Sequence, residues 1–234
     1  MSKRPPRVLA QIADDIGWVR GSDAHHLIHV LRARPGDLVT VLDGGGGSWH
    51  GRIERIGAGE AAVRLLLREP TAAPRERVLC CGLIRPARWD WLVEKAVELE
   101  ATRIVPLTTE RSHRVPAALA EAKRARWEKL ARAACKQSGR PDLPRIDPPR
   151  AVAELGGCGL PAVRLLLSAA AAAALHEVAP GLRAGGIALA VGPEGGFTPL
   201  EEQQLLDLDF RPVRLGPRIL RVETAALAAL AALL

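Results

Sequence analysis

Two segments rich in glycine and proline, near the end of the chain, have the residue types of a ligand-binding site. The first is residues 192–196, with the sequence GPEGG, and the second is residues 215–221, with the sequence LGPRILR. Glycine permits backbone conformations with positive φ and leaves room for a ligand to touch the backbone. We expect the two segments to form the two halves of one ligand site; a tight turn without a ligand is the alternative for each.

The sequences of these segments exclude two common kinds of nucleotide site. The Gly-x-Gly-x-x-Gly fingerprint of dinucleotide-binding domains is absent, and no Gly-Lys-Ser/Thr follows the GPEGG segment, as a phosphate-binding loop would require. A small, largely apolar ligand, whose few polar edges are bound by backbone groups, fits better than a di- or triphosphate.

The GPEGG segment must follow a strand and precede a helix. Residues 187–191 are all apolar, which predicts a strand in the middle of a sheet. Thr198, Pro199 and Glu201 have the pattern of a capping box with proline at the first helical position, which predicts that a helix begins there. Ligands of open α/β sheets bind at the carboxyl ends of the strands, and this segment lies at such an end.

After a proline-containing linker at residues 69–75, the chain alternates between strand and helix patterns. Runs that are wholly or mostly apolar predict strands at residues 78–84, 104–107, 163–167, 187–191 and 212–215. Helical spacing or composition predicts helices at residues 88–100, 116–137, 169–174 (six alanines) and 223–234. This alternation indicates an α/β domain with a mostly parallel sheet over residues 73–234.

Residues 1–72 have the pattern of a small β-barrel. β-prone runs at residues 38–42, 49–56 and 61–67 are separated by turns that contain glycine. One short helix is expected at residues 24–31, with Asp23 as its N-cap.

The chain carries a net charge of +7, which is unevenly distributed. Residues 71–150 contain 17 basic and 10 acidic side chains, whereas residues 151–234 contain 6 basic and 8 acidic ones. A basic middle region suggests that a polyanion such as nucleic acid lies on one face of the molecule. A solubilising surface would have the same composition, so charge alone leaves both interpretations open.

The cysteines and histidines do not form a recognisable metal site. The four cysteines lack the spacing of metal ligands, and buried thiols in a reducing cytoplasm explain them. The cluster of His25, His26 and His29 has no cysteine or carboxylate partner at ligand spacing, so we expect no metal. No apolar run is long enough to span a membrane, and the start of the chain lacks the apolar stretch of a secretory signal. We therefore expect a cytoplasmic protein.

The two glycine-containing segments, in this order and spacing, resemble those of the SPOUT-class RNA methyltransferases. The forms GPEGG and LGPRILRVETA (residues 215–225) are more narrowly similar to the RsmE type, bacterial enzymes that methylate N3 of a uridine in small-subunit ribosomal RNA. Other similar blocks are residues 26–37, 94–99, 110–112 and 126–140. Glu100 and Val222 depart from the family, which usually has glycine and threonine at these positions.

The resemblance implies a fold, a cofactor and a substrate. The expected fold is an α/β SPOUT-type methyltransferase domain with a deep trefoil knot, preceded by a PUA-like RNA-binding β-barrel. The expected enzyme is a homodimer that uses S-adenosylmethionine to methylate N3 of a specific uridine in 16S ribosomal RNA, within the small subunit. The residues expected to bind the cofactor are Leu167, Ser168, Gly192, Glu194, Gly195, Gly196, Leu215, Gly216, Ile219, Leu220 and Thr224.

Methylation at uridine N3 requires removal of the proton that N3 carries at neutral pH. A cation near O2 or O4 would stabilise the resulting anion, and Arg221 is the candidate for this role. Glu223 is the candidate base. The candidate RNA-binding residues are Arg32, Arg34, Lys95, Arg111, Arg126 and Arg140.

Two other functions compete with this one. Another SPOUT enzyme would methylate a ribose 2′-hydroxyl or a guanine, but the LGPRILRVETA form resembles the uridine-N3 group. A non-enzymatic RNA-binding assembly factor would show the same basic middle region without binding the cofactor.

Overall fold

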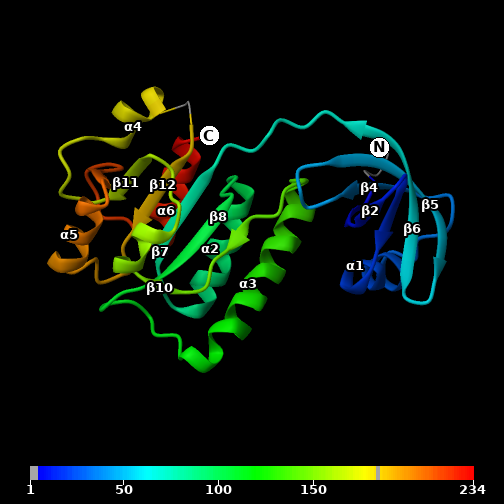
Figure 1. Ribbon diagram of the computed structural model, residues 1–234, viewed down its shortest axis with the longest axis horizontal. Coiled ribbons are helices and arrows are strands. Elements are labelled where there is room, and N and C mark those ends of the chain that lie inside the picture. Colours follow the sequence, from blue (N-terminus) through cyan, green and yellow to red (C-terminus); the bar gives the residue numbers. More distant parts are fainter. Residues whose placement is uncertain (1–4, 183–184) are drawn as a thin grey trace. The chain divides into compact units, whose positions relative to one another are not determined.

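The computed structural model of the chain describes residues 5–182 and 185–234. The start of the chain, where we expect no secretory signal, therefore lies partly outside the described residues, because residues 1–4 are not among them. The chain forms two compact units (Figure 1). One consists of residues 1–74 and 135–143, and the other consists of residues 75–134 and 144–234. Within the described ranges, no helix combines the length and apolar character needed to cross a membrane.

The N-terminal unit is built on a curled sheet of six strands (Figure 1). The strands, in the order β1-β4-β5-β6-β3-β2, are β1 (Arg7–Leu9), β4 (Leu38–Leu42), β5 (Ser48–Gly57), β6 (Glu60–Glu69), β3 (Ile16–Val19) and β2 (Gln11–Ala13). The three strands predicted in this region are confirmed as β4, β5 and β6. Val41, Ile53 and Val63 point into its core and are buried.

The short helix of this unit differs from the prediction. Helix α1 (Gly21–His25) begins after Arg20, and a π-helix, η1 (His26–Val30), follows it directly. Asp23 therefore lies inside α1, and its predicted role as N-cap is wrong. Its carboxylate instead accepts a hydrogen bond from Lys136 Nζ at 2.6 Å, which is a contact that no local pattern could predict.

The segment 135–143 belongs to the N-terminal unit although it lies far along the chain. The Arg7 guanidinium donates to the carbonyl oxygens of Lys136 and Gln137 at 3.2 and 2.7 Å. The backbone amide of Leu143 donates to the carbonyl of Gly44 at 2.9 Å. A single boundary in the sequence cannot describe a unit that recruits a distant segment in this way.

The second unit is an α/β domain with a parallel seven-stranded sheet (Figure 1). The strand order is β10-β8-β7-β12-β11-β13, and β9 pairs with β8. The strands are β7 (Arg77–Gly82), β8 (Arg103–Thr108), β9 (Arg145–Ile146), β10 (Arg150–Ala151), β11 (Val163–Leu167), β12 (Ile187–Val191) and β13 (Arg211–Val213). All five predicted strands and the parallel sheet are confirmed.

Helices pack against this sheet. They are α2 (Pro86–Glu98), α3 (Ala117–Ser138), η2 (Val152–Gly157), α4 (Leu175–Val178), η3 (Ala179–Leu182), α5 (Pro199–Asp207) and α6 (Val222–Ala232), of which η2 and η3 are 3-10 helices. Helices α2 and α6 contact each other, and α6 also contacts β7 and β12. Helix α5 packs against η2. The predicted helices at residues 88–100, 116–137 and 223–234 are confirmed as α2, α3 and α6.

The helix predicted for the six alanines at residues 169–174 is wrong. These residues form turns, and the short helix α4 begins only at Leu175. Their backbone groups bond to Arg214 instead: the Arg214 amide donates to the carbonyl of Ala173 at 2.9 Å, and its Nη1 donates to the carbonyl of Ala171 at 3.0 Å. Helix propensity is a weak preference that tertiary hydrogen bonds override.

The family departure at Glu100 coincides with an unusual backbone conformation. Glu100 follows the end of α2 with φ at +61°, a conformation that glycine adopts more easily than other residues. The Glu100 carboxylate pairs with Arg77 Nη1 at 2.8 Å, and only 6% of the Arg77 side chain is exposed. Glu100 therefore supplies an ion pair that a glycine could not provide.

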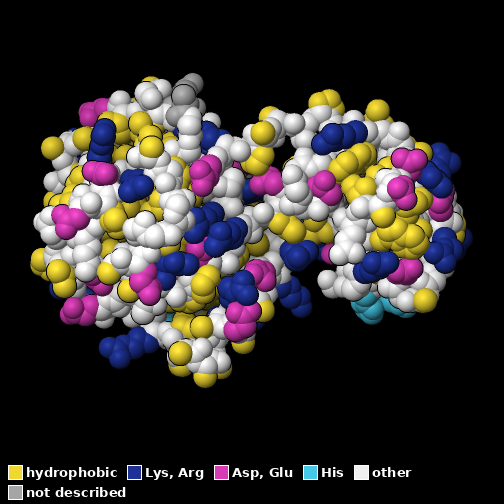
Figure 2. All heavy atoms as spheres, viewed as in Figure 1, with side chains coloured by type: hydrophobic (Ala, Val, Ile, Leu, Met, Phe, Trp, Pro, Cys, Tyr) yellow, Lys and Arg dark blue, Asp and Glu magenta, His cyan; other side chains and the backbone are white. Residues whose placement is uncertain are grey.

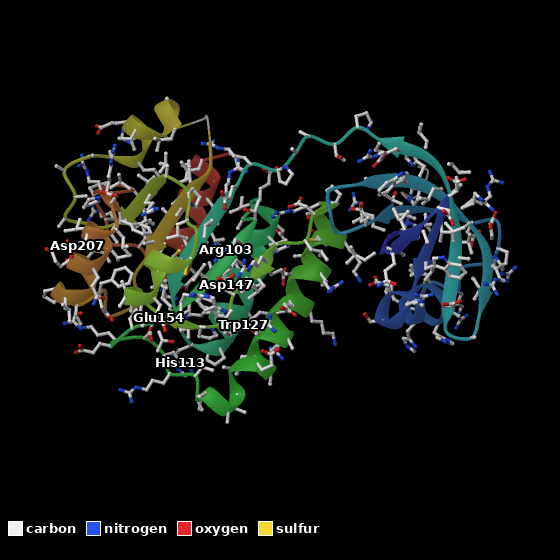
Figure 3. The ribbon with its side chains drawn as sticks, viewed as in Figure 1. Arg103, His113, Trp127, Asp147, Glu154 and Asp207 are labelled. Carbon is white, nitrogen blue, oxygen red and sulfur yellow. The ribbon has the colours of Figure 1, made fainter. Side chains whose placement is uncertain are left out.

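A buried carboxylate joins three strands at one side of the sheet. Asp147 is fully buried and accepts from Arg103 Nη2 at 2.7 Å (Figure 3) and from Arg150 Nη2 at 3.2 Å, and it forms an ion pair with Arg145 Nε at 2.8 Å. These arginines come from β8, β9 and β10. Because a buried charge is stable only when it is paired, Asp147 holds these strand ends together.

Candidate active site

A cavity of about 640 Å³ lies at the carboxyl ends of β11, β12 and β13. Leu167, Val191 and Val213, which are the last residues of these strands, all line it. Parallel strands bring their carboxyl ends to the same edge of a sheet, which is where open α/β sheets bind ligands. Both glycine-containing segments contribute to its wall.

The end of β7 and the side chain of Arg111 hold the GPEGG segment in place. A Cβ atom on Gly82, at the end of β7, would lie 2.6 Å from the backbone nitrogen of Pro193. The strand therefore passes directly against the segment, and only glycine fits there. Arg111 Nη1 donates to the carbonyl of Gly195 at 3.0 Å. Gly196 has φ at +70°, which requires glycine at the turn.

Helix α5 begins as the sequence predicts. Thr198 Oγ1 accepts from the amide of Glu201 at 3.2 Å, and Glu201 Oε2 accepts from the amide of Thr198 at 2.8 Å. Glu201 Oε1 also accepts from the amide of Glu110 at 2.9 Å. The confirmed capping box thus fixes the chain just after the GPEGG segment and ties it to the loop that follows β8.

The second segment supplies an open, partly apolar wall. Ile219 is 90% exposed and Leu220 is 40% exposed, although both line the cavity. Among the described residues, a Cβ atom on Gly216 would have no neighbour within 4 Å. Exposed apolar side chains beside open backbone are suited to cover a ligand that is partly apolar.

Arg88 connects the two sides of the cavity, and sequence reasoning missed it. Its Nη1 lies 2.6 Å from Glu194 Oε1, in the GPEGG segment, and its Nε lies 3.8 Å from Glu223 Oε1. Arg88 and Glu194 are 106 residues apart, so no local pattern links them. Glu223 is buried, and its Oε2 has no hydrogen-bond partner among the described residues.

The structure brings most of the expected site residues together. All of the expected cofactor residues except Gly195 and Thr224 line the cavity, and so does Arg221. Glu223 does not line it but contacts Arg88, which does. The lining residues Val191 and Val213 were also missed, although their positions at predicted strand ends could have indicated them.

Three of the expected RNA-binding residues, Lys95, Arg126 and Arg140, are held in ion pairs. Lys95 Nζ donates to the carboxylates of Glu98 at 2.7 Å and Glu94 at 2.9 Å, and these hydrogen bonds raise the pKa of the lysine. Arg126 pairs with Asp90 at 2.7 Å, and the pKa of Arg126 is raised for the same reason. Figure 2 likewise shows acidic side chains interspersed among the basic ones on the α/β unit.

Arg140 and the three remaining expected RNA-binding residues differ in exposure. Arg32 and Arg34 are exposed on the N-terminal unit. Arg111 is exposed but is bonded to the GPEGG segment. Arg140 is buried and donates to the Asp142 carboxylate. Arg32 and Arg34 are therefore the most accessible to a phosphate.

Both units of the chain match families of known proteins. The family model for the RNA methyltransferase domain matches residues 71–234, and that for the RNA methyltransferase PUA domain matches residues 19–66. A ribosomal RNA small subunit methyltransferase E from Synechocystis is 35% identical over 94% of this chain and 73% of its own length. The protein of that name from Bacillus subtilis is 30% identical over 92% of this chain and 88% of its length.

This chain belongs to the ribosomal RNA small subunit methyltransferase E family. A solved member of the family, from Neisseria gonorrhoeae and bound to S-adenosyl methionine, superposes with a TM-score of 0.87. It is 33% identical, and the match covers 98% of this chain and 96% of that chain. The family resemblance inferred from the sequence is therefore confirmed, as are the methyltransferase fold and the PUA domain. Membership in the methyltransferase E family makes the chain an enzyme, which removes the assembly-factor alternative.

Proposed function

We propose that this chain transfers a methyl group from S-adenosylmethionine to N3 of a uridine in 16S ribosomal RNA of the small subunit. The observation that carries the proposal is one cavity lined by both glycine-containing segments. The ligand of the Neisseria relative supports the cofactor, and the names of the curated relatives support the small-subunit substrate. The LGPRILRVETA form supports uridine N3 as the acceptor.

The cavity suits S-adenosylmethionine in size and chemistry. Its volume of about 640 Å³ falls within the range of roughly 300–1,000 Å³ for small-molecule sites. Leu167, Val191 and Leu220 offer apolar walls for a flat ring, and residues 192–196 offer backbone polar groups. We propose that the expected cofactor residues that line the cavity bind S-adenosylmethionine. Gly195 and Thr224 do not line the cavity, and we propose that they support the residues that do.

The bound cofactor supplies an activated methyl group. The chain must then orient the uridine, because alignment of the reacting atoms supplies much of the rate. Arg221 is exposed and lines the cavity, so we propose that it stabilises negative charge on O2 or O4 as the N3 proton leaves.

Glu223 has two candidate roles that one variant separates. A buried carboxylate with an unused oxygen can accept a proton as the base. The same carboxylate, 3.8 Å from Arg88, can instead position Arg88 in the cavity wall. In Glu223→Gln, loss of the base lowers kcat and leaves cofactor affinity intact, whereas loss of Arg88 positioning weakens cofactor affinity.

We propose that residues 1–72 and the α/β unit both contribute to RNA binding. Arg32 and Arg34 on the N-terminal unit, with Arg111 and Arg126 on the α/β unit, contact RNA phosphates. Lys95 contributes by exchanging its carboxylate partners for phosphate, since partly exposed ion pairs are weak. Arg140 is buried with Asp142 and orders its loop. We also propose that the α/β unit contains the trefoil knot implied by the family. We further propose that the protein is a homodimer located in the cytoplasm.

The proposal is tested in cells that lack the gene for this activity. N3 methylation blocks Watson–Crick pairing, so reverse transcription of 16S ribosomal RNA is expected to stop at one uridine when the gene is restored. A ribose 2′-O-methyl group gives no comparable stop. Absence of a restored stop, together with calorimetric binding of S-adenosylmethionine, would favour another target for the methyl group; absence of cofactor binding would contradict the proposal as a whole.

A further inference from the structure

A second pocket lies in the α/β unit and shares no lining residue with the cofactor cavity. Its volume is about 210 Å³, and α2, the loop of residues 113–116 and α3 surround it. The loop is anchored at its start, because the amide of His113 donates to the carbonyl of Leu83 at 2.8 Å. The pocket therefore has a defined wall on each side.

The interior of this pocket is apolar and aromatic. The rings of Trp89 and Trp127 lie 5.5 Å apart at a tilt of 53°, and both side chains line the pocket. Trp127 comes from α3 and His113 from the loop after β8 (Figure 3). Trp89 Nε1 is buried and has no acceptor among the described residues. This nitrogen therefore lies in the packed interior, and with only 1% of Trp89 and 3% of Trp127 exposed the two rings form the buried base of the pocket.

The rim of the pocket is positively charged. Arg114 and Lys123 line it, and neither forms an ion pair within the described part of the chain. The acidic lining residue, Asp90, is neutralised by Arg126 at 2.7 Å. An anionic group at the rim would therefore meet two uncompensated cations.

The volume limits the ligand to about one ring. A protein cavity of about 150 Å³ accommodates benzene, whereas sites for drug-sized ligands begin at roughly 300 Å³. At about 210 Å³, the pocket has room for one substituted heteroaromatic ring and leaves the groups attached to that ring outside.

We propose that this pocket binds one unpaired base of the RNA substrate, with a neighbouring phosphate at Arg114 and Lys123. A nucleobase has a flat apolar face, and it is always attached to an anionic backbone. Proteins that read single-stranded RNA bind such bases against aromatic side chains. The inference rests on the proposed RNA substrate and assigns a second contact to it, away from the methylated uridine.

The test uses the full chain and two matched variants. Leu119 is 49% exposed and lines the pocket, whereas Leu206 on α5 is 41% exposed and lines neither pocket. Leu119→Trp therefore fills the pocket without removing a buried side chain, and Leu206→Trp controls for an added surface indole. Binding of fluorescein-labelled hexauridylate and hexaadenylate is measured at fixed salt, because phosphate contacts depend on ionic strength.

We expect Leu119→Trp to weaken binding of at least one oligonucleotide by about tenfold, which corresponds to loss of one stacked base. Leu206→Trp should bind within twofold of the unmodified chain, and all three proteins should keep the same melting temperature and cofactor affinity. Crosslinks from 4-thiouridine in the RNA should map to residues 113–127 or to Trp89 in the unmodified chain.

Unchanged oligonucleotide affinity in Leu119→Trp would overturn the inference. So would a change in oligomeric state by light scattering with RNA affinity intact, since the pocket would then receive a protein partner. These measurements do not need methyl transfer. If the unmodified chain transfers no methyl group to small-subunit RNA, the proposed function fails while the pocket is still tested.

Discussion

At the scale of single residues, the cavity depends on close contacts between parts of the chain that are distant in sequence. Gly82 at the end of β7 allows Pro193 to approach, and Arg88 on α2 reaches both Glu194 and Glu223. The glycines of residues 192–196 could be recognised from the sequence because their spacing is local. Arg88 could not, because an arginine on an amphipathic helix is usually exposed to solvent.

A pair of substitutions at Gly216 tests whether this cavity holds the cofactor. Gly216→Ala should bind S-adenosylmethionine within threefold of the unmodified chain, because the added Cβ meets no atom of the described residues within 4 Å. Gly216→Phe should weaken binding at least tenfold, because its ring would occupy space that the ligand needs. Isothermal titration measures the affinity, and equal melting temperatures show that the fold is intact. Equal affinity in the two variants would place the ligand elsewhere.

A second pair of substitutions separates backbone strain from the ion pair at Glu100. Both Glu100→Gly and Glu100→Ala remove the contact with Arg77, but only glycine relaxes the positive φ. Glu100→Gly should therefore be more stable than Glu100→Ala by about 1–2 kcal/mol. Urea denaturation measures the difference, and the reverse order would show that the left-handed conformation is not strained.

At the scale of elements, the strands and the longer helices follow their local patterns. Val163–Leu167 and Ile187–Val191 are strands with the predicted bounds. All five residues of Ile187–Val191 are apolar and buried, as expected for a strand inside a parallel sheet. The alanines at residues 169–174 do not follow their pattern. Alanine favours a helix only weakly, and hydrogen bonds from Arg214 hold these residues in turns.

Helix α5 offers a test of how an element supports the site. Thr198→Ala removes the side-chain oxygen that accepts from Glu201, so the free energy of unfolding should fall by about 1 kcal/mol. Cofactor affinity should fall severalfold, because α5 begins directly after the GPEGG segment. Thr198→Ser keeps the acceptor and should retain both properties. A Thr198→Ala variant with unchanged stability would show that the Glu201 contacts alone hold the helix start.

At the scale of the whole molecule, buried thiols make stability depend on pH in the alkaline range. Burial raises the pKa of Cys80 from 9.0 to about 12, and burial also raises the pKa of Cys81. Above pH 9 the unfolded chain loses these thiol protons while the folded chain keeps them. Stability is therefore fully present below pH 9 and decreases as the pH rises toward the folded pKa values.

The contribution of Cys80 can be measured directly. Between pH 9.5 and 11, the free energy of unfolding of the unmodified chain should fall more steeply than that of Cys80→Ala, by about 1.4 kcal/mol per pH unit. The comparison of slopes removes the contribution of the lysines, and the chain contains no tyrosine. Equal slopes would show that the Cys80 thiol ionises as readily in the folded chain as in the unfolded one.

The sequence by itself determined the parallel α/β sheet, the glycine-containing segments, the cap of α5 and the family. Each of these is recognised from patterns of residues that are close together in the chain, where spacing and propensity act directly. Only the tertiary structure showed that Arg88 joins Glu194 to Glu223, that residues 135–143 belong to the N-terminal unit, and that Trp89 and Trp127 border a second pocket. Those features depend on contacts across more than 30 residues of chain, and such contacts form only when the sheet brings distant segments together.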